Sequence, residues 1–130
     1  KYRPLGLAPE AGGGLLGSYR GGHIEVTHAS IPGKGDVRRR NEFIRKDCCH
    51  QQLSDSLWER SSGEIIYIGE WHTHPTAIPS PSARDYKEWY AKLPMATMVL
   101  LIQGLHGLRV DMLEVVNGKK YIRQLSPIEV

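Results

Sequence analysis

A short segment near the middle of the chain contains four side chains that could bind a metal ion or work beside one. His72 and His74 are separated by one residue, seven residues then lead to Ser82, and Asp85 follows after two more. Imidazole nitrogens and carboxylate oxygens are ligands that Zn²⁺ accepts, and three protein ligands leave a fourth position for water, as in catalytic zinc sites. The spacing therefore predicts one zinc ion with an open position, which is typical of a hydrolase.

The residues before this segment predict how the two histidines are placed. Residues 64–71 are rich in β-branched and aromatic side chains and predict a strand that enters His72. Residues i and i+2 of a strand point to the same face, so we expect His72 and His74 to project together and Thr73 to point away. A His-x-His pair alone is more often a packed or surface pair, and only the ordered residues after it favour a metal.

The residues after the histidines predict a loop and the start of a helix. Prolines interrupt residues 75–81, and Ser82 suits the N-cap of a helix that runs to about residue 92. Asp85 then lies in the first turn, and a loop of this length can bring it back to the two imidazoles. Ser82 and Asp85 are also ordinary capping residues, and capping is compatible with metal binding because a capped helix holds Asp85 still.

A zinc hydrolase needs a general base, and three glutamates compete for that role. Glu10 stands just before a glycine-rich segment that leads into a strand. Glu70 lies two residues before His72, on the same face of a regular strand, where it could be the base or could orient an imidazole through a hydrogen bond. Glu25 is expected on a solvated strand face and is the weakest candidate. Spacing alone does not separate Glu10 from Glu70.

These segments together resemble the JAMM (JAB1/MPN/Mov34) metalloprotease family. The resemblance rests on Glu10-x-Gly-Gly-x-Leu-Leu-Gly followed by His-x-His-Pro and the spaced Ser and Asp, and it covers nearly the whole chain. Residues 67–75, Tyr-Ile-Gly-Glu-Trp-His-Thr-His-Pro, look closest to the bacterial JAB-type members. Several of those belong to operons that also encode E1-like and E2-like proteins, including CBASS antiphage operons built around a cGAS-like nucleotidyltransferase.

The resemblance implies a role for each site residue. His72, His74 and Asp85 would bind one zinc ion, which lowers the pKa of its water toward about 7 and polarises the scissile carbonyl. Glu10 would take a proton from that water and deliver it to the leaving amine. Ser82 would donate a hydrogen bond to the oxyanion, a contact typically worth about 2.7–4 kcal/mol.

The resemblance also implies the fold, an α/β (α+β) domain of the JAMM/MPN, cytidine-deaminase-like type, with a mixed sheet flanked by helices. We expect one domain over residues 1–130, with an N-terminus that is trimmed, because family members usually open with a further strand or helix. The chain departs from the family at Gly14, where a bulky apolar residue is usual. We expect this glycine to weaken the strand and leave the chemistry intact.

The remaining pattern predicts an alternation of strands and helices. The expected elements are strands over 14–20 and 23–31, a loop over 33–40, a short strand over 42–45, a helix from an N-cap at Asp47 to Trp58, and strands over 95–103, 108–116 and 119–125. Leu53, Leu57 and Trp58 should lie near one helix face, and Trp71 and Trp89 should pack under the site.

Composition and charge limit the remaining function classes. The formal net charge is +3, and the arginines of residues 38–40 are expected in a solvated loop; without stacking aromatics they make nucleic-acid binding unlikely. No segment approaches the roughly 20 apolar residues of a membrane span. Cys48 and Cys49 are adjacent, where a disulfide would be strained, so we expect core packing with His50 and a reduced, cytoplasmic protein.

Three functions fit these patterns. The first is a zinc isopeptidase that cleaves the bond between the C-terminus of a conjugated protein, such as a cGAS-like nucleotidyltransferase or a ubiquitin-like protein, and its target. The second is a JAMM hydrolase that trims a ubiquitin-like sulfur carrier, or a RadC-like protein of another role. The third, a non-catalytic MPN scaffold, is disfavoured because every expected ligand is present. A substrate tail is expected in a groove beside the zinc, walled by residues 32–40 and 75–81.

Overall fold

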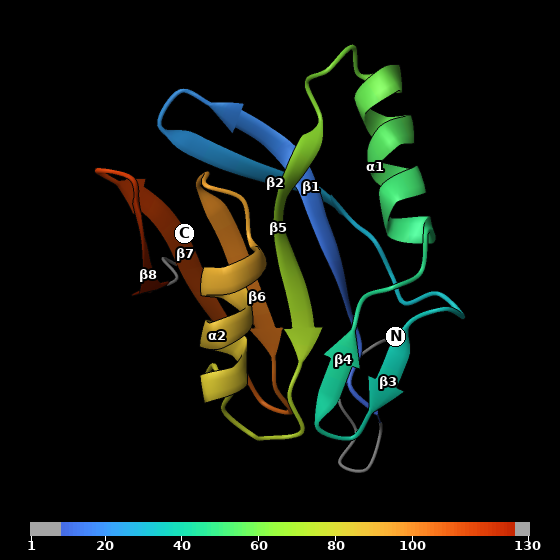
Figure 1. Ribbon diagram of the computed structural model, residues 1–130, viewed down its shortest axis with the longest axis vertical. Helices are drawn as coiled ribbons and strands as arrows, with labels where there is room; N and C mark the ends of the chain where they lie inside the picture. The colour runs from blue at the N-terminus through green and yellow to red at the C-terminus, as the bar shows by residue number, and fades with distance from the viewer. Residues whose placement is uncertain (1–8, 127–130) are drawn as a thin grey trace.

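A computed structural model describes residues 9–126, which form a six-stranded sheet, a two-stranded hairpin and two helices (Figure 1). The elements are β1 (Gly12–Arg20), β2 (His23–Ala29), β3 (Val37–Arg39), β4 (Glu42–Ile44), α1 (Cys49–Arg60), β5 (Ile66–Thr73), α2 (Ala83–Lys92), β6 (Met98–Gln103), β7 (Leu108–Val116) and β8 (Lys119–Leu125). This mixed sheet with two helices confirms the predicted α/β (α+β) class. Neither described helix is long and apolar enough to cross a membrane.

The strand order places the two ends of the motif side by side. The large sheet runs β2-β1-β5-β6-β7-β8, and only β5 and β6 are parallel. A parallel pair needs a crossover, which the proline loop and α2 supply between these two strands. On the other side β1 pairs antiparallel with β5, with Gly12 opposite His72. The chain just before β1 therefore reaches the end of β5, where the histidines lie.

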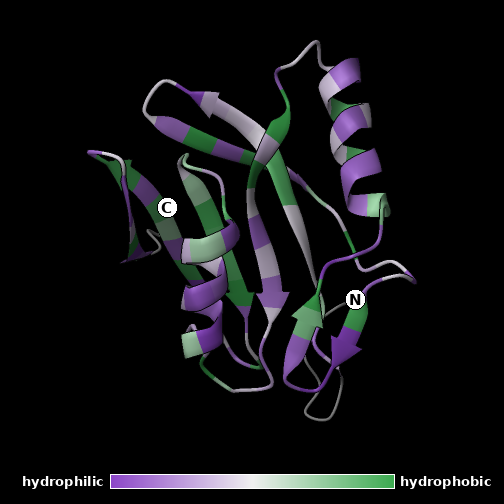
Figure 2. Cartoon of the chain, viewed as in Figure 1, coloured by the Kyte–Doolittle hydropathy of each residue, from purple (hydrophilic) through white to green (hydrophobic). Residues whose placement is uncertain are grey.

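The core divides into two clusters because strand side chains alternate between faces. On β6, Leu100 and Ile102 pack with Trp89 of α2 and with Leu93 just after it, whereas Val99 packs with residues of the opposite face. Figure 2 shows hydrophobic residues along β6 and many hydrophilic residues in both helices. Tyr67 packs against the α2 cluster and also lines a small pocket beside α1. Both helices therefore cover the same face of the sheet.

Helix α2 matches its prediction closely, but α1 differs at both ends. Helix α1 begins at Cys49, with Cys48 rather than Asp47 at the N-cap, although the Asp47 carboxylate still accepts a hydrogen bond from the Cys49 N–H at 2.8 Å. The helix runs on to Arg60. Of the three residues predicted near one helix face, Leu57 is buried, whereas Trp58 is 57% exposed.

Three strand predictions also need correction. The expected loop over 33–40 contains β3, which pairs with β4 in a hairpin. Strand β6 begins at Met98 rather than at residue 95, because the turn after Pro94, closed by a hydrogen bond from the Ala96 N–H, delays it. Strand β2 ends at Ala29 rather than residue 31.

Candidate metal centre

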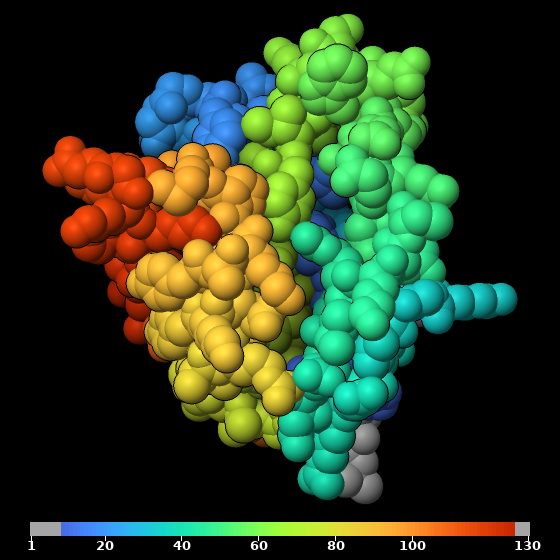
Figure 3. Space-filling view, viewed as in Figure 1, coloured from blue at the N-terminus to red at the C-terminus, as the bar shows by residue number. Residues whose placement is uncertain are grey.

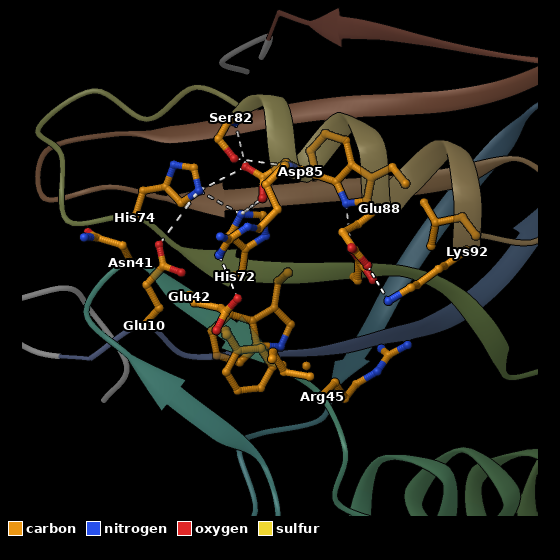
Figure 4. Close-up of a pocket in the computed structure, with 18 of the residues that line it drawn as sticks. Glu10, Asn41, Glu42, Arg45, His72, His74, Ser82, Asp85, Glu88 and Lys92 are labelled. Atoms are coloured by element: carbon orange, nitrogen blue, oxygen red, sulfur yellow. Dashed lines mark hydrogen bonds and ion pairs between the residues drawn. The ribbon is translucent and has the colours of Figure 1, made fainter.

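Two histidines lie at the end of β5 with their ring nitrogens directed at one point (Figure 4). The Nε2 atoms of His72 and His74 are 3.0 Å apart. The backbone of His74 is held by a hydrogen bond from its N–H to the Gln103 carbonyl of β6 at 3.0 Å. Both imidazoles are largely buried, with 12% and 13% of their side chains exposed. The strand therefore presents the pair together, as its alternation predicts.

The first turn of α2 brings a carboxylate to the same point. Asp85 places Oδ1 3.3 Å from His72 Nε2 and Oδ2 3.1 Å from His74 Nε2. The helix start fixes this position: the Ser82 hydroxyl accepts a hydrogen bond from the Asp85 N–H at 3.1 Å, and Asp85 Oδ2 accepts one from the Ser82 N–H at 2.8 Å. This reciprocal cap confirms the predicted helix start.

The distances among the three ligand groups fit a small cation. A tetrahedral ion with bonds of about 2.0–2.1 Å holds its ligand atoms roughly 3.3 Å apart. The measured separations of 3.0, 3.3 and 3.1 Å are close to that value. Burial tends to raise the pKa of Asp85, but hydrogen bonds from His72 and His74 outweigh burial and hold it well below its usual range. The aspartate is therefore ionised, as a metal ligand must be.

A glutamate from the start of the described chain faces this centre. Glu10 Oε1 lies 4.0 Å from His74 Nε2, and the residue is only 6% exposed. The hairpin holds its backbone: the Glu10 N–H donates to the Arg39 carbonyl at 2.7 Å, and Arg38 Nε donates to the Glu10 carbonyl at 3.0 Å. Burial raises the Glu10 pKa to about 7, against the attraction of the two histidines. Arg38 therefore fastens the glutamate segment and does not belong to a solvated loop.

Thr73, between the two histidines, connects this glutamate segment to β5. Its hydroxyl accepts a hydrogen bond from the Ala11 N–H at 2.9 Å, and its own N–H donates to the Ala11 carbonyl at 2.9 Å. The threonine is 2% exposed and points away from the ligand pair. At Gly12 an added Cβ would lie 2.6 Å from the Phe43 ring, so glycine lets the hairpin approach. Sequence reasoning missed the positioning role of Thr73, although a buried polar residue between two ligands was a usable signal.

The other two glutamates have different surroundings. Glu70 Oε1 accepts a hydrogen bond from the Trp89 indole at 2.6 Å, which turns this carboxylate toward α2, and the Trp89 ring lies 6.2 Å from that of His72. Glu70 is thus linked to a ligand only through a neighbouring ring. Glu25 lies on β2 in an exposed ion pair with Arg20 at 2.8 Å, away from the centre.

A groove of about 790 Å³ leads away from the metal centre. Residues 41–45 form one wall and residues 84–94 of α2 and its end form the other, while Tyr67, Glu70 and Trp71 lie along its length. Figure 3 shows it as a hollow between α2 and the β4 segment. The expectation that residues 32–40 form a wall is wrong, because β4 stands between them and the groove; Pro75 and Thr76 are the lining residues from the second expected loop.

A second cluster, Asp36, Cys49 and His50, also has metal-ligand chemistry. Its polar atoms are already engaged: Asp36 accepts backbone hydrogen bonds from Gly33, Lys46 and Asp47, and both ring nitrogens of His50 are bonded. Burial raises the pKa of the Cys49 thiol to about 11, so it stays protonated. This cluster is structural.

Core packing was predicted for Cys48 and Cys49 together with His50. His50 is buried and both cysteines are free, but Cys48 is exposed, so the prediction is wrong for Cys48.

Comparison with known proteins agrees with this architecture. A protein of Desulfitobacterium hafniense, solved in solution, matches with a TM-score of 0.66 at 19% identity, over 98% of this chain and 82% of that one. Four relatives are named CD-NTase/cGAS isopeptidase, and they include proteins of Escherichia coli and Pseudomonas aeruginosa. The Escherichia coli protein is 47% identical over 73% of this chain and 62% of its own length. The Pseudomonas aeruginosa protein is 45% identical over 92% of this chain and 77% of its own length.

The mixed sheet, with two histidines at a strand end and an aspartate in a capped helix turn, defines an α+β domain with a group of residues that could hold a metal ion. The family model for prokaryotic homologs of the JAB domain matches residues 4–112. The chain therefore belongs to this prokaryotic JAB family. It spans less than two thirds of the length of the Escherichia coli relative.

Proposed function

We propose that this protein is a zinc-dependent isopeptidase that cleaves the amide bond joining the C-terminus of one protein to an amine of another. The observation that carries the proposal is the convergence of His72, His74 and Asp85 within 3.3 Å of one another, at one end of a long groove and beside a buried glutamate. A bound zinc ion would supply Lewis acidity, polarising a carbonyl and lowering the pKa of water.

The neighbouring side chains are suited to the proton and charge transfers of amide hydrolysis. Glu10, whose pKa burial raises to about 7, can take a proton from an attacking water and pass it to the leaving amine. Because Ser82 Oγ accepts from the Asp85 N–H, its own O–H stays free to donate to the oxyanion of the tetrahedral intermediate. His72, His74 and Asp85 would hold the metal.

The shape of the groove favours a polypeptide tail. Five consecutive residues, 41–45, line it, and β4 pairs with β3 on its other side only. An extended tail can add to this strand edge through backbone hydrogen bonds. The acyl side of the scissile bond is such a chain, whereas the leaving lysine offers only a flexible side chain. We infer that the tail of the conjugated protein lies along β4, with its terminal carbonyl at the metal centre.

The names of the relatives indicate a substrate class. Since four of them are named CD-NTase/cGAS isopeptidase, we propose that the conjugated protein is a cGAS-like nucleotidyltransferase. An E1/E2-like conjugating system would supply such a substrate, and the reaction would reverse that conjugation in antiphage defence.

The test uses a nucleotidyltransferase whose C-terminus is joined to a lysine of a carrier protein. Gel electrophoresis measures its cleavage. We expect Glu10→Gln to keep the fold and the metal but to lower kcat by at least roughly a hundredfold, because general acid–base catalysis contributes 10²–10⁴-fold. Glu25→Gln is the matched control and should cleave normally. If Glu70→Gln abolished cleavage while Glu10→Gln stayed active, the base would be Glu70, and no cleavage by the zinc-loaded wild type would contradict the function.

A further inference from the structure

One cation in the groove lacks the acidic partner that the others have. Arg84 pairs with Glu42 at 2.7 Å and Lys92 pairs with Glu88 at 2.6 Å. Arg45 instead lies over the Tyr67 ring, 5.3 Å from its centroid, with Nη2 3.4 Å from the Tyr67 hydroxyl. Among the described residues, no carboxylate oxygen lies within ion-pair distance of this guanidinium. Glu70 and Asp36 attract the guanidinium only from beyond that distance. The groove therefore contains one positive charge that a ligand carboxylate can pair with directly.

The glycine that departs from the family pattern makes room for this arginine. A Cβ added at Gly14 would lie 3.2 Å from Arg45 Nη1 and 3.4 Å from the Tyr67 ring. A large apolar side chain at this place on β1 would push the guanidinium off Tyr67. Gly14 costs strand stability, but it also lets Arg45 lie over the Tyr67 ring in the lining of the groove.

Arg45 also lies where the groove meets a second hollow. A pocket of about 290 Å³ between β1 and α1 shares Arg45 and Tyr67 with the groove and is also lined by Lys46. The carboxylate of Asp47, which lines the same pocket, already accepts hydrogen bonds from the N–H groups of Cys49 and Gly35. Where the groove and the pocket meet, the side chains of Arg45 and Lys46 are therefore suited to binding an anion.

We propose that Arg45, resting on Tyr67 and Gly14, selects an acidic side chain in the tail of the substrate. The inference rests on the proposed function, because it assumes a tail extended along β4. Figure 4 shows Asn41 beside His74 and Arg45 at the other end of the groove. With a rise of about 3.3 Å per residue, the selected side chain lies roughly three to four residues before the scissile bond. A carboxylate there can accept two hydrogen bonds from the guanidinium.

The test measures binding of labelled peptides to the Glu10→Gln protein by fluorescence anisotropy. This variant allows binding to be measured without turnover. The peptides are ten residues long, end in a free carboxylate, and carry Asp, Asn or Lys at the third, fourth or fifth position from the C-terminus. We expect Asp at one position to bind roughly tenfold more tightly than Lys, which corresponds to one charge-assisted hydrogen-bonded contact. Adding Arg45→Glu should reverse this order so that the Lys peptide binds more tightly.

Two further variants separate charge from structure. Gly14→Leu keeps every charge but displaces the guanidinium, so it should abolish the preference for Asp while circular dichroism shows an intact fold. Lys119→Glu on the remote strand β8 changes the net charge by the same amount as Arg45→Glu and should leave the preference unchanged. Equal losses for Asp, Asn and Lys peptides in Arg45→Glu, or no binding by any peptide, would overturn the inference. Cleavage of the conjugate by the wild type is scored separately, so the proposed function can stand if this subsite does not exist.

Discussion

Glu10 faces His74, and two backbone connections hold it there from opposite sides. On one side Arg38 and Arg39 of the hairpin bond its carbonyl and its N–H. On the other side the next residue, Ala11, exchanges two hydrogen bonds with Thr73. Strand β5, which carries the histidines, thus also positions the Glu10 carboxylate. Thr73, between His72 and His74, makes this connection.

Thr73→Val should therefore reduce activity without removing the metal. Valine has nearly the same shape but cannot accept the Ala11 hydrogen bond, and leaving a buried N–H unsatisfied costs about 1–3 kcal/mol of unfolding free energy. Misplacement of Glu10 should lower kcat by roughly ten- to a hundredfold. The measurements are denaturant unfolding, metal content and conjugate cleavage. Thr73→Ser, which keeps the hydroxyl, should recover most of the kcat, and equal activity of the Val and Ser variants would contradict this role.

At this scale the sequence was informative where chemistry and local geometry coincide. The strand alternation of His72 and His74 and the cap formed by Ser82 and Asp85 are both local, so their placement could be predicted from spacing. The choice between Glu10 and Glu70 could not, because it depends on which strand pairs with β5 and on the Trp89 hydrogen bond to Glu70.

Among the elements, the hairpin β3–β4 connects the site to the rest of the fold. Asp36, just before it, accepts hydrogen bonds from backbone N–H groups on both sides of the hairpin and from His50. His50 in turn bonds Ser30, whose hydroxyl oxygen accepts from the Gly14 N–H at 2.7 Å. One buried carboxylate thus holds the base of the hairpin against α1 and β1.

Asp36→Asn should make the protein less stable in a pH-dependent way. Burial favours a higher Asp36 pKa, but hydrogen bonds from Asp47, Gly33 and His50 outweigh it and lower the pKa from 3.8 to about 2. A depressed pKa stabilises the fold above pH 3.8, and this contribution is lost as the pH falls through about 2. The free energy of unfolding of the wild type should exceed that of the variant by about 2 kcal/mol at pH 7, and the difference should shrink in acid.

Denaturant unfolding from pH 7 down to pH 2 measures this difference. Asp55→Asn is the matched control, since Asp55 is exposed on α1 and accepts a hydrogen bond from the Gln51 side chain. The change in free energy of unfolding that Asp55→Asn causes should be small and should not shrink in acid as that of Asp36→Asn does. A constant difference between wild type and Asp36→Asn over the whole range would show that the carboxylate does not hold the hairpin by its charge.

The hairpin is also the element that sequence reasoning predicted least well. Strand β3 has three residues, two of them arginines, and neither alternation nor β-branched content marks it. Its partner β4 was expected as a short strand, but its position beside the groove follows from Arg38 and Glu10, which are far apart in the sequence. Long-range contacts of this kind leave no periodic signal, so the groove wall was assigned to the wrong residues.

For the whole molecule, placing both helices on one face of the sheet creates the groove. Helix α2 stands over β6, and α1 with the hairpin stands over β1, so the end of β5 is left accessible between them (Figures 1 and 3). The ion pair between Arg84 and Glu42 joins the two sides beside the metal ligands. The order of the strands was not predictable from hydropathy alone, whereas the class of the fold was.

The most direct test of this account is the zinc content of the purified protein, measured by elemental analysis beside a His72→Ala/His74→Ala variant. We expect about one zinc per chain in the wild type and loss of the zinc in a variant that remains folded. A wild type that contains no zinc when purified without chelator, and takes up none when zinc is added, would contradict the metal centre and the hydrolase built on it.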